Sequence, residues 1–378
     1  MVPSDSPPET LKRSPLHGAH IAAGARLTEF AGWQLPVSFG GDLAEHRAVR
    51  EAAGLFDLSH MAQFEVRGRD AGASLDHALA GRASAIAPGR AKYSLLLDAS
   101  GGIIDDLIVY RTGEDRFLVV ANAANREAVA TALVERAAGG VAVDQPDGAA
   151  LLAVQGPAAL AVLSELAGMD DGAAAALAGL GYYTSLETRL AGRPVLVSRT
   201  GYTGEDGFEL YTTAEAAGSL WDLLLDAGGP HGLVPAGLAA RDSLRLEAGM
   251  PLYGHELTRA VFPQQAGLGR VVALDPGHDF VGRAAVEAGP GADAPVLVGL
   301  TGTGRRPARE GYPVLDGDAV VGTVTSGTLS PTLGHPIAFA YVSPAVAAPG
   351  SALEVDIRGS RHPFTVTPTP FYRRKQRP

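Results

Sequence analysis

The sequence predicts an α+β protein in which two related lobes are followed by a small β-barrel or sandwich. Between Gln63 and Val120 the pattern is mostly that of short strands separated by turn residues, and an amphipathic helix is expected over residues 125–138. A similar order of strands and returning helices recurs from Leu151 to Glu247, which indicates a second lobe of the same kind. No fixed period is visible, so the two lobes are alike in pattern without being a sequence repeat.

The elements of the first lobe are expected in the following order. A short helix begins just after Ser14, and an extended segment follows at residues 35–37. Residues 45–53 have the pattern of a second helix, which Gly54 closes. Alternation and apolar runs bounded by turn residues then predict strands at 64–66, 93–97, 103–110 and 117–121.

The second lobe and the C-terminal part follow the same logic. Strands are expected at 151–154, 195–198 and 208–211, and helices at 158–166, 214–225 and 238–247. After about Gly282 six short strands are separated by Gly, Pro or Asp, at 296–300, 314–315, 320–324, 338–342, 353–357 and 364–366. The chain therefore divides into a polar, proline-rich leader at 1–13 that is expected to be disordered, two interleaved lobes at 14–281, and a barrel domain at 282–378.

Composition and charge exclude several classes of function. The chain contains no cysteine, which rules out disulfides, thiolate metal sites, cysteine-bound iron–sulfur clusters and thiol nucleophiles. The net charge of −10 argues against nonspecific nucleic-acid binding, and the basic residues from Arg373 to Arg377 are interpreted as a solvated tail. No apolar run approaches the ~20 residues of a membrane-spanning helix. Since no hydrophobic signal segment precedes Ser14 either, a cytoplasmic protein is expected.

Generic catalytic patterns are missing from the sequence. It has no Walker loop, no Gly-x-Ser-x-Gly segment and no His-Glu-x-x-His motif. His17, His20 and His46 have no paired carboxylates at ligand spacing, so no metal site is expected.

An acidic pair interrupts the apolar strand predicted at 103–110. Neighbouring side chains of a strand face opposite ways, so one of Asp105 and Asp106 is expected to face the interior or a cleft and the other the solvent. A buried carboxylate is costly unless it is paired or hydrogen-bonded, which makes the inward acid a candidate functional group. An acid that caps the turn of a hairpin explains the pair equally well.

Residues 199–209 contain three glycines and several polar side chains. The glycines allow the backbone to approach a flat ligand, and Tyr202 offers stacking area. The carboxylate of Glu205 suits the aminopyrimidine edge of a pterin. A polar β-hairpin without a ligand is the open alternative.

Two further stretches are rich in polar residues. Arg241 and Arg245 share one face of the helix predicted at 238–247, where guanidinium groups suit the glutamate tail or ring oxygen of a folate. A surface network with Asp242 and Glu247 explains the same pattern. Residues 322–333 form a polar, turn-rich loop that by itself specifies no function.

Nine segments, in this order and spacing, resemble the aminomethyltransferase (T-protein) family of the glycine cleavage system over nearly the whole chain. The matching segments are FAGWQLPV at 30–37, EHRAVREAAGLFDLSHM at 45–61, GGIIDDLIVY at 101–110, VVANAANRE at 119–127, AVQGP at 153–157, RTGYTGEDGFE at 199–209, ARDSLRLEAGMPLYGHEL at 240–257, DFVGRAA at 279–285 and VTSGTLSPTLG at 324–334.

The resemblance implies a three-domain cloverleaf that binds tetrahydrofolate in its central channel. It implies transfer of the methylene group of an aminomethylated dihydrolipoyl arm, carried by the lipoylated H-protein, to tetrahydrofolate. Ammonia leaves and 5,10-methylenetetrahydrofolate forms. A monomer without a metal is expected.

The resemblance also assigns roles to individual residues. Asp106, the second acid of the pair, matches the catalytic acid placed near the reactive folate nitrogens, where an ionised carboxylate kept charged by an arginine or backbone donors would act. Asn122 matches a residue lining the folate channel, and Glu205 and Arg241 match polar contacts to the folate. Tyr93 and Tyr202 are expected in the channel wall.

One position departs from the family, and two related activities compete with the T-protein reading. Many T-proteins have Trp where Arg270 follows Gly269, which puts a local folate contact in doubt. A folate-dependent demethylase of a small sulfonium or N-methyl compound would use the same folate site. A folate-binding assembly factor for iron–sulfur proteins would need a cysteine motif that the chain lacks.

Overall fold

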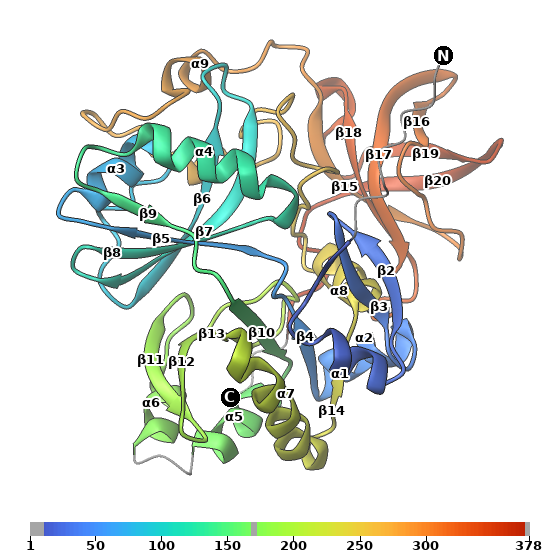
Figure 1. Ribbon diagram of the computed structural model, residues 1–378. Helices are drawn as coiled ribbons and strands as arrows, with labels where there is room; N and C mark the ends of the chain where they lie inside the picture. Colours follow the sequence, from blue (N-terminus) through green and yellow to red (C-terminus); the bar gives the residue numbers. More distant parts are fainter. Residues whose placement is uncertain (1–10, 168–171, 375–378) are drawn as a thin grey trace, which may run out of the picture.

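Two β-sheets that face each other form the larger part of the molecule, which the computed structural model describes over residues 11–167 and 172–374. The first sheet has the order β11 (Ser185–Leu190), β12 (Arg193–Ser198), β13 (Gly207–Thr213), β10 (Ala149–Gln155), β4 (Ala53–Asp57) and β14 (Leu233–Pro235). The second has the order β6 (Arg90–Leu97), β7 (Ile103–Gly113), β8 (Arg116–Ala121), β5 (Ala62–Arg67) and β9 (Ala142–Asp144). They form the lower and upper left lobes in Figure 1.

Helices cover the outer face of each sheet. The first sheet packs on α5 (Ala159–Ala167), α6 (Ala173–Gly179) and α7 (Ala214–Gly228), and Trp221 of α7 is one of the buried residues of that core. The second packs on α3 (Ala71–Ala78) and α4 (Arg126–Arg136). A separate apolar cluster joins the inner faces of both sheets, which therefore share one interior. The predicted α+β lobes are confirmed.

The chain passes between the two sheets at strand β4, which the sequence pattern did not predict. The helix expected over 45–53 is α2 (Asp42–Glu51), and the residues after it form β4. All five residues of β4 are buried, and the strand pairs with β10 and β14 in the first sheet before the chain enters the second at β5. Gly54 does not end a helix, because it lies within this strand, where a Cβ atom would meet Val49 Cγ2 at 2.5 Å.

The N-terminal segment forms a small sheet beside the lobes. A short helix, α1 (His17–Ala22), precedes a hairpin of β2 (Arg26–Phe30) and β3 (Trp33–Ser38). Residues 1–10 of the expected leader lie outside the described residues. However, β1 (Lys12–Arg13) pairs in parallel with β3, so ordered chain begins before residue 14, and the expected disorder is wrong there.

Six strands close into the C-terminal barrel, which excludes the sandwich. The strands, in barrel order, are β15 (Val296–Gly302), β18 (Pro336–Val342), β17 (Ala319–Leu329), β16 (Pro313–Asp316), β19 (Ala352–Ile357) and β20 (Ser360–Thr367). The preceding helix α9 (Arg283–Ala288) packs against the second sheet, because Val286 shares a cluster with Leu95 and Leu97. By packing, the barrel therefore begins at Val296, later than the expected residue 282.

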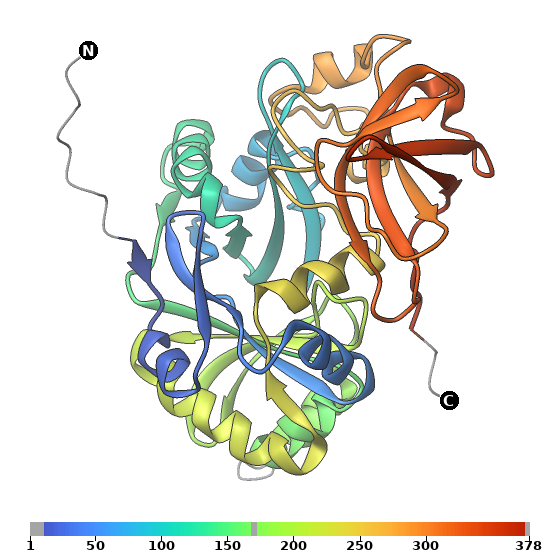
Figure 2. The ribbon, with the colours of Figure 1, turned by 90° about the vertical axis from the view of Figure 1, so that its right-hand side faces the viewer.

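The three parts meet around α8 (Leu238–Glu247), as the cloverleaf expectation requires. Figure 1 shows α8 at the junction of the lobes, and Figure 2 shows it in yellow between the barrel at the upper right and the blue N-terminal elements. Gly237 starts this helix where a Cβ atom would lie 2.5 Å from the carbonyl of Val37. Its N–H donates to Glu45 Oε2 at 2.9 Å, so α2 and β3 fix the start of α8. In the described ranges, no helix has both the length and the apolar character to cross a membrane.

Candidate active site

A cavity of about 710 Å³ lies where the two sheets, the β2–β3 hairpin, α8 and the barrel meet. Its wall combines aromatic and aliphatic side chains with a few convergent polar groups, which is the usual character of a small-molecule site. Five of the six residues proposed from the sequence line it, namely Tyr93, Asp106, Asn122, Tyr202 and Arg241.

Asp106 reaches the cavity from β7. The register pairs Tyr93 with Ile108, so Tyr93 and Asp106 are diagonal neighbours on one face of the β6–β7 pair. The Tyr93 hydroxyl donates to Asp106 Oδ2 at 3.0 Å, and Asn122 Nδ2 donates to Asp106 Oδ1 at 2.9 Å. Each carboxylate oxygen therefore keeps an acceptor position for a ligand. Burial raises the pKa of the Asp106 carboxyl group, although these two hydrogen bonds oppose the rise.

The neighbouring acid, Asp105, faces the other way but does not reach solvent. It is fully buried, which corrects the expectation that one acid of the pair would be exposed. Its carboxylate accepts hydrogen bonds from the backbone and side chain of Asn122 and from Asn125 Nδ2. Burial, with the charge of Asp106 in second place, raises the pKa of Asp105 to about 7.

Tyr202 and Arg241 form a stacked pair in the cavity wall. The guanidinium carbon of Arg241 lies 4.6 Å from the centre of the Tyr202 ring, whose hydroxyl donates to the carbonyl of Pro251. Within the described ranges no carboxylate lies within ion-pair distance of Arg241, so its charge is available to an anionic or carbonyl group of a ligand.

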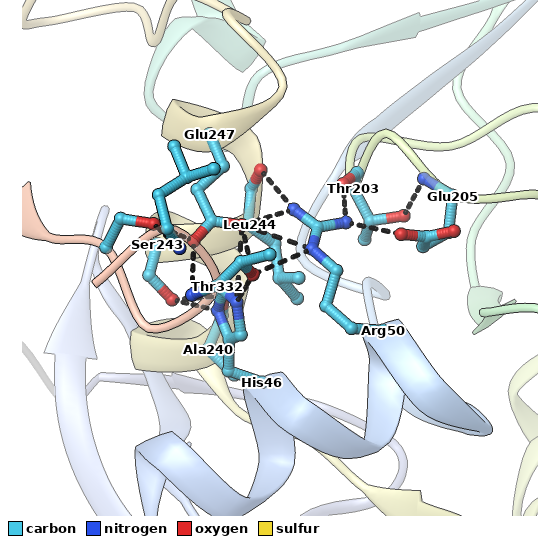
Figure 3. A network of polar contacts seen from close by, with 11 residues as sticks. His46, Arg50, Thr203, Glu205, Ala240, Ser243, Leu244, Glu247 and Thr332 are labelled. Atoms are coloured by element: carbon cyan, nitrogen blue, oxygen red, sulfur yellow. Dashed lines mark hydrogen bonds and ion pairs between the residues drawn. The ribbon is translucent and has the colours of Figure 1, made fainter. Parts of the chain in front are cut away.

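Glu205 is placed away from the cavity, contrary to the expectation that it contacts folate. Its carboxylate accepts a hydrogen bond from Arg50 Nη1 at 2.9 Å in the buried network shown in Figure 3. Arg50 also binds Glu247 at 2.7 Å, and Glu247 accepts from Thr332 of the barrel. This network joins α2, α8, the 199–209 segment and the barrel, so the role of Glu205 is to hold these parts together.

Glu209, four residues later, lines the cavity instead. Its Oε2 atom accepts hydrogen bonds from Thr200, Tyr110 and Tyr211, at 2.5, 3.1 and 3.2 Å. No described residue donates to its Oε1, which leaves that oxygen for a ligand. An acid inside the apolar strand 208–211 is the same signal that drew attention to Asp106, and it was available in the sequence.

The remaining residues that the sequence analysis singled out lie in or near the cavity wall, but not all of them are available to bind a ligand. Arg245 lines the wall, but its guanidinium is held by Glu256 at 2.9 Å and by Ser326 of the barrel at 2.8 Å. Arg270 is exposed and does not line the cavity, whereas Leu268 does, so no stacking by Arg270 replaces the family Trp. Most of the loop expected over 322–333 is instead strand, because residues 322–329 belong to β17, and three of them, Thr325, Ser326 and Gly327, contribute to the wall.

Two residues of the cavity wall were not predicted from the sequence. Tyr183 precedes β11, and burial raises the pKa of its hydroxyl. His60 follows β4, and burial, together with the charge of Arg241, lowers the pKa of its imidazole to about 4. The imidazole is therefore neutral at physiological pH. Within residues 11–167 and 172–374, no group of three or more His, Asp and Glu side chains is arranged to hold a metal ion.

Two models of known protein families match most of the chain. Residues 16–276 match the family described as GCVT N-terminal domain, and residues 296–373 match the glycine cleavage T-protein C-terminal barrel domain. The chain belongs to the T-protein family of the glycine cleavage system.

Relatives of the same family match over almost the whole chain. An aminomethyltransferase of Cutibacterium acnes is 53% identical over 371 residues, covering 97% of this chain and 99% of the relative. An aminomethyltransferase of Streptomyces coelicolor is 52% identical, with the same two coverages. The crystal structure of the glycine cleavage system aminomethyltransferase T from Bartonella henselae has a TM-score of 0.88 at 37% identity, covering 97% of this chain and 99% of that one.

These matches confirm the family, the fold and the reaction class expected from the sequence. The activity is that of an aminomethyltransferase of the T-protein family, and the matches do not support the alternative, a demethylase of small sulfonium or N-methyl compounds. T-proteins use tetrahydrofolate and receive their one-carbon unit from the H-protein of the glycine cleavage system.

Proposed function

We propose that the central cavity binds tetrahydrofolate with its reactive nitrogens beside Asp106, and that the aminomethylated lipoyl arm of the H-protein delivers its methylene group there. The observation that carries the proposal is the setting of Asp106. Its carboxylate lies on the cavity wall with one donor on each oxygen and a remaining acceptor position on each.

The polar groups of the wall suit the two ends of a folate. Glu209 offers one free carboxylate oxygen, which an amino group and ring N–H of a pterin can engage. Arg241 is half-buried against Tyr202 without an ion-pair partner in the described chain, a costly state for a desolvated charge unless a ligand supplies an anion or a carbonyl oxygen. The ring of Tyr202 also presents an aromatic surface to the cavity.

Asp106 is the group in this wall that is suited to take a proton from a folate nitrogen. Transfer of the methylene group breaks one C–N and one C–S bond of the aminomethyl thioether and forms two C–N bonds to the folate. The two folate N–H protons end on ammonia and on the dihydrolipoyl thiol. A carboxylate beside the nitrogens accepts a proton and stabilises positive charge that develops on the moving carbon.

The setting of Asp106 differs in one respect from the expectation. The sequence reading expected an arginine or backbone donors to keep the acid ionised. In the described chain, the groups that lower its pKa are the Tyr93 hydroxyl, the Asn122 side chain and a backbone hydrogen bond at Asp106 itself, and no arginine is among them. Because burial raises its pKa, Asp106 is a stronger base than an exposed carboxylate and remains a candidate proton acceptor.

The proposal extends to the partner and the working state of the enzyme. The lipoyl arm, an apolar chain that ends in a polar group, suits a wall that includes Phe30, Met61 and Leu252 beside the acid. We also retain from the sequence the hypotheses of a cytoplasmic monomer that needs no metal, with the lipoylated H-protein as its partner and with no nucleic-acid or membrane partner.

The experiment that tests this function supplies the purified chain with tetrahydrofolate and aminomethylated H-protein. We expect ammonia and 5,10-methylenetetrahydrofolate in equal amounts, and no product when a sulfonium or N-methyl donor replaces the H-protein. Addition of a metal chelator is expected to leave the rate unchanged. Ammonia release at the same rate without folate would contradict the proposed role of the cavity.

A further inference from the structure

We propose that Asp105 is a positioning residue for the transfer reaction, because it fixes the side-chain amide of Asn122 with its NH2 group toward Asp106 and its oxygen toward the cavity. The inference rests on the proposed role of Asp106 and adds to it a residue that does not touch the cavity. Asp105 is fully buried and is absent from the cavity lining.

The geometry links the two acids through one side chain. Asn122 Nδ2 lies 2.8 Å from Asp105 Oδ1, 2.9 Å from Asp106 Oδ1 and 3.1 Å from the Asp106 carbonyl oxygen. The backbone N–H of Asn122 donates to Asp105 Oδ2 at 3.0 Å, and Asn125 Nδ2 donates to Asp105 Oδ1 at 2.7 Å. Asp105 therefore holds both the backbone and the side chain of the first residue after β8.

This arrangement determines which way the Asn122 amide points. Three acceptor oxygens surround its nitrogen, so a reversed amide would place its own oxygen against two carboxylate oxygens. No described residue donates to Asn122 Oδ1, and Asn122 lines the cavity. The locked amide thus keeps one N–H on Asp106 and presents an acceptor to the folate.

The proximity of the acids also couples their charges. Burial and the charge of Asp106 raise the pKa of Asp105 to about 7, so Asp105 gains or loses its own charge near neutral pH beside an ionised Asp106. The other ionisable groups facing the pair are Tyr93 from β6 and three tyrosines from loops, Tyr183, Tyr202 and Tyr253. Burial raises the pKa of each of them. Among these groups of the described chain, Asp105 is therefore the one that titrates near neutral pH.

If the role of Asp105 is purely structural, its hydrogen bonds serve only to connect β7 to the turn between β8 and α4. The two roles differ in what the isosteric change Asp105→Asn does. It replaces an acceptor by an amide that can oppose the Asn122 NH2 group, and it removes the neighbouring charge. A positioning role predicts loss of turnover and a shifted pH profile, whereas a structural tie predicts only lower stability.

The test compares Asp105→Asn with Asp98→Asn in the complete chain, using aminomethylated H-protein and tetrahydrofolate. Asp98 is the matched control because it lies at the turn end of the same β6–β7 hairpin, where it accepts from Ser100 and Gly102 and does not line the cavity. We expect Asp105→Asn to lower kcat on the order of ten- to a hundredfold, as loss of orienting contacts does. Its kcat profile should also lose the change near pH 7 at which Asp105 titrates in the wild type, because the substituted amide carries no charge. Asp98→Asn should retain wild-type kcat and profile.

Three outcomes are distinguishable. If Asp105→Asn keeps the kcat and pH profile of Asp98→Asn while Asp106→Asn is inactive, the inference is overturned and the proposed function stands. If Asp106→Asn itself retains turnover, the proposed role of the cavity acid fails first. If Asp105→Asn does not fold, the wild-type protein labelled with [15N]asparagine decides. The side-chain NH2 signal of Asn122 is assigned as the one that is missing from the spectrum of Asn122→Ala. Its chemical shift in the wild type should titrate with a midpoint near pH 7, and a signal that does not titrate overturns the inference.

Discussion

Arg50 and Glu247 join two helices at the centre of the molecule through two hydrogen bonds, of 2.7 and 3.1 Å, to one carboxylate oxygen. The side chain of Glu247 is fully buried, and its other oxygen accepts from Ser330 and from the backbone of Thr332 in the barrel. The guanidinium of Arg50 also lies 4.0 Å from the ring of Tyr372, beyond the last barrel strand. One ion pair thus holds the lobes, the barrel and the C-terminal segment together around the cavity.

Removing the charge of Glu247 is expected to destabilise the fold, and more so at neutral than at acidic pH. Burial alone would raise the pKa of Glu247, but the hydrogen bond and charge of His46 and the charge of Arg50 lower it to about 2. A folded pKa below the unfolded value adds stability that is present above about pH 4.5 and is lost as the pH falls toward 2. Glu247→Gln should therefore lower the free energy of unfolding by roughly 2–4 kcal/mol at pH 7.

Urea unfolding at pH 7 and pH 3 measures this effect. The matched control is Glu287→Gln, which breaks the half-exposed pair of Glu287 with Arg283 and is expected to cost less than about 1 kcal/mol. Equal losses in the two variants at pH 7, or a loss for Glu247→Gln that does not shrink at pH 3, would contradict this account.

The two glutamates of the 199–209 segment are expected to separate folate binding from stability. Glu209→Gln removes the charge of the free oxygen in the cavity and should raise the Kd for tetrahydrofolate about tenfold or more, since hydrogen bonds to a charged group contribute roughly 1.5–3 kcal/mol. Glu205→Gln should leave that Kd within about twofold and lower Tm, because Glu205 binds Arg50 outside the cavity. Calorimetric titration and thermal unfolding of both variants check the pair, and the reverse pattern would restore Glu205 as the folate contact.

The choice between these glutamates shows what the sequence can and cannot decide. The glycines and Tyr202 of the segment indicated a site for a flat ligand, and Tyr202 lines the cavity. Which glutamate enters the cavity depends on Arg50, more than 150 residues earlier in the chain, and no local pattern contains that pairing. For the same reason, alternation placed Asp105 and Asp106 on opposite faces but could not reveal that Asn122 and Asn125 bury the far side.

Strand β4 shows a second kind of limit. Only Ala52 separates α2 from this strand, so no Gly, Pro or Asn marks the change, and the run continues the apolar pattern of the helix. The barrel strands were easier to predict because Gly, Pro or Asp separates them. The cloverleaf as a whole followed from the nine family segments, which record tertiary relationships that local propensity does not contain.

The stacked pair of Arg241 and Tyr202 is expected to need a guanidinium and not merely a positive charge. Arg241→Lys keeps the charge but loses the planar group 4.6 Å from the ring centre, and we expect the Kd for tetrahydrofolate to rise about tenfold. Arg270→Lys, at an exposed position outside the cavity, is the control and should bind folate like the wild type. Equal affinities for all three proteins would remove Arg241 from the folate site.

Asp106→Asn is expected to separate catalysis from binding. Asparagine has nearly the same shape and one oxygen that can still accept from Tyr93 or Asn122, so the cavity should retain its affinity for tetrahydrofolate. The amide cannot take a proton from the folate nitrogen, and kcat for methylene transfer should fall on the order of 10²–10⁴-fold. Folate titration and a timed assay with aminomethylated H-protein measure the two quantities in one preparation.

Because burial raises the pKa of Asp106, the wild-type rate should fall as the pH decreases toward that raised value and the carboxylate becomes protonated. The residual rate of Asp106→Asn should lack this acidic limb. An Asp106→Asn enzyme that kept near-normal turnover, or one with the wild-type acidic limb, would assign proton transfer to another group of the wall.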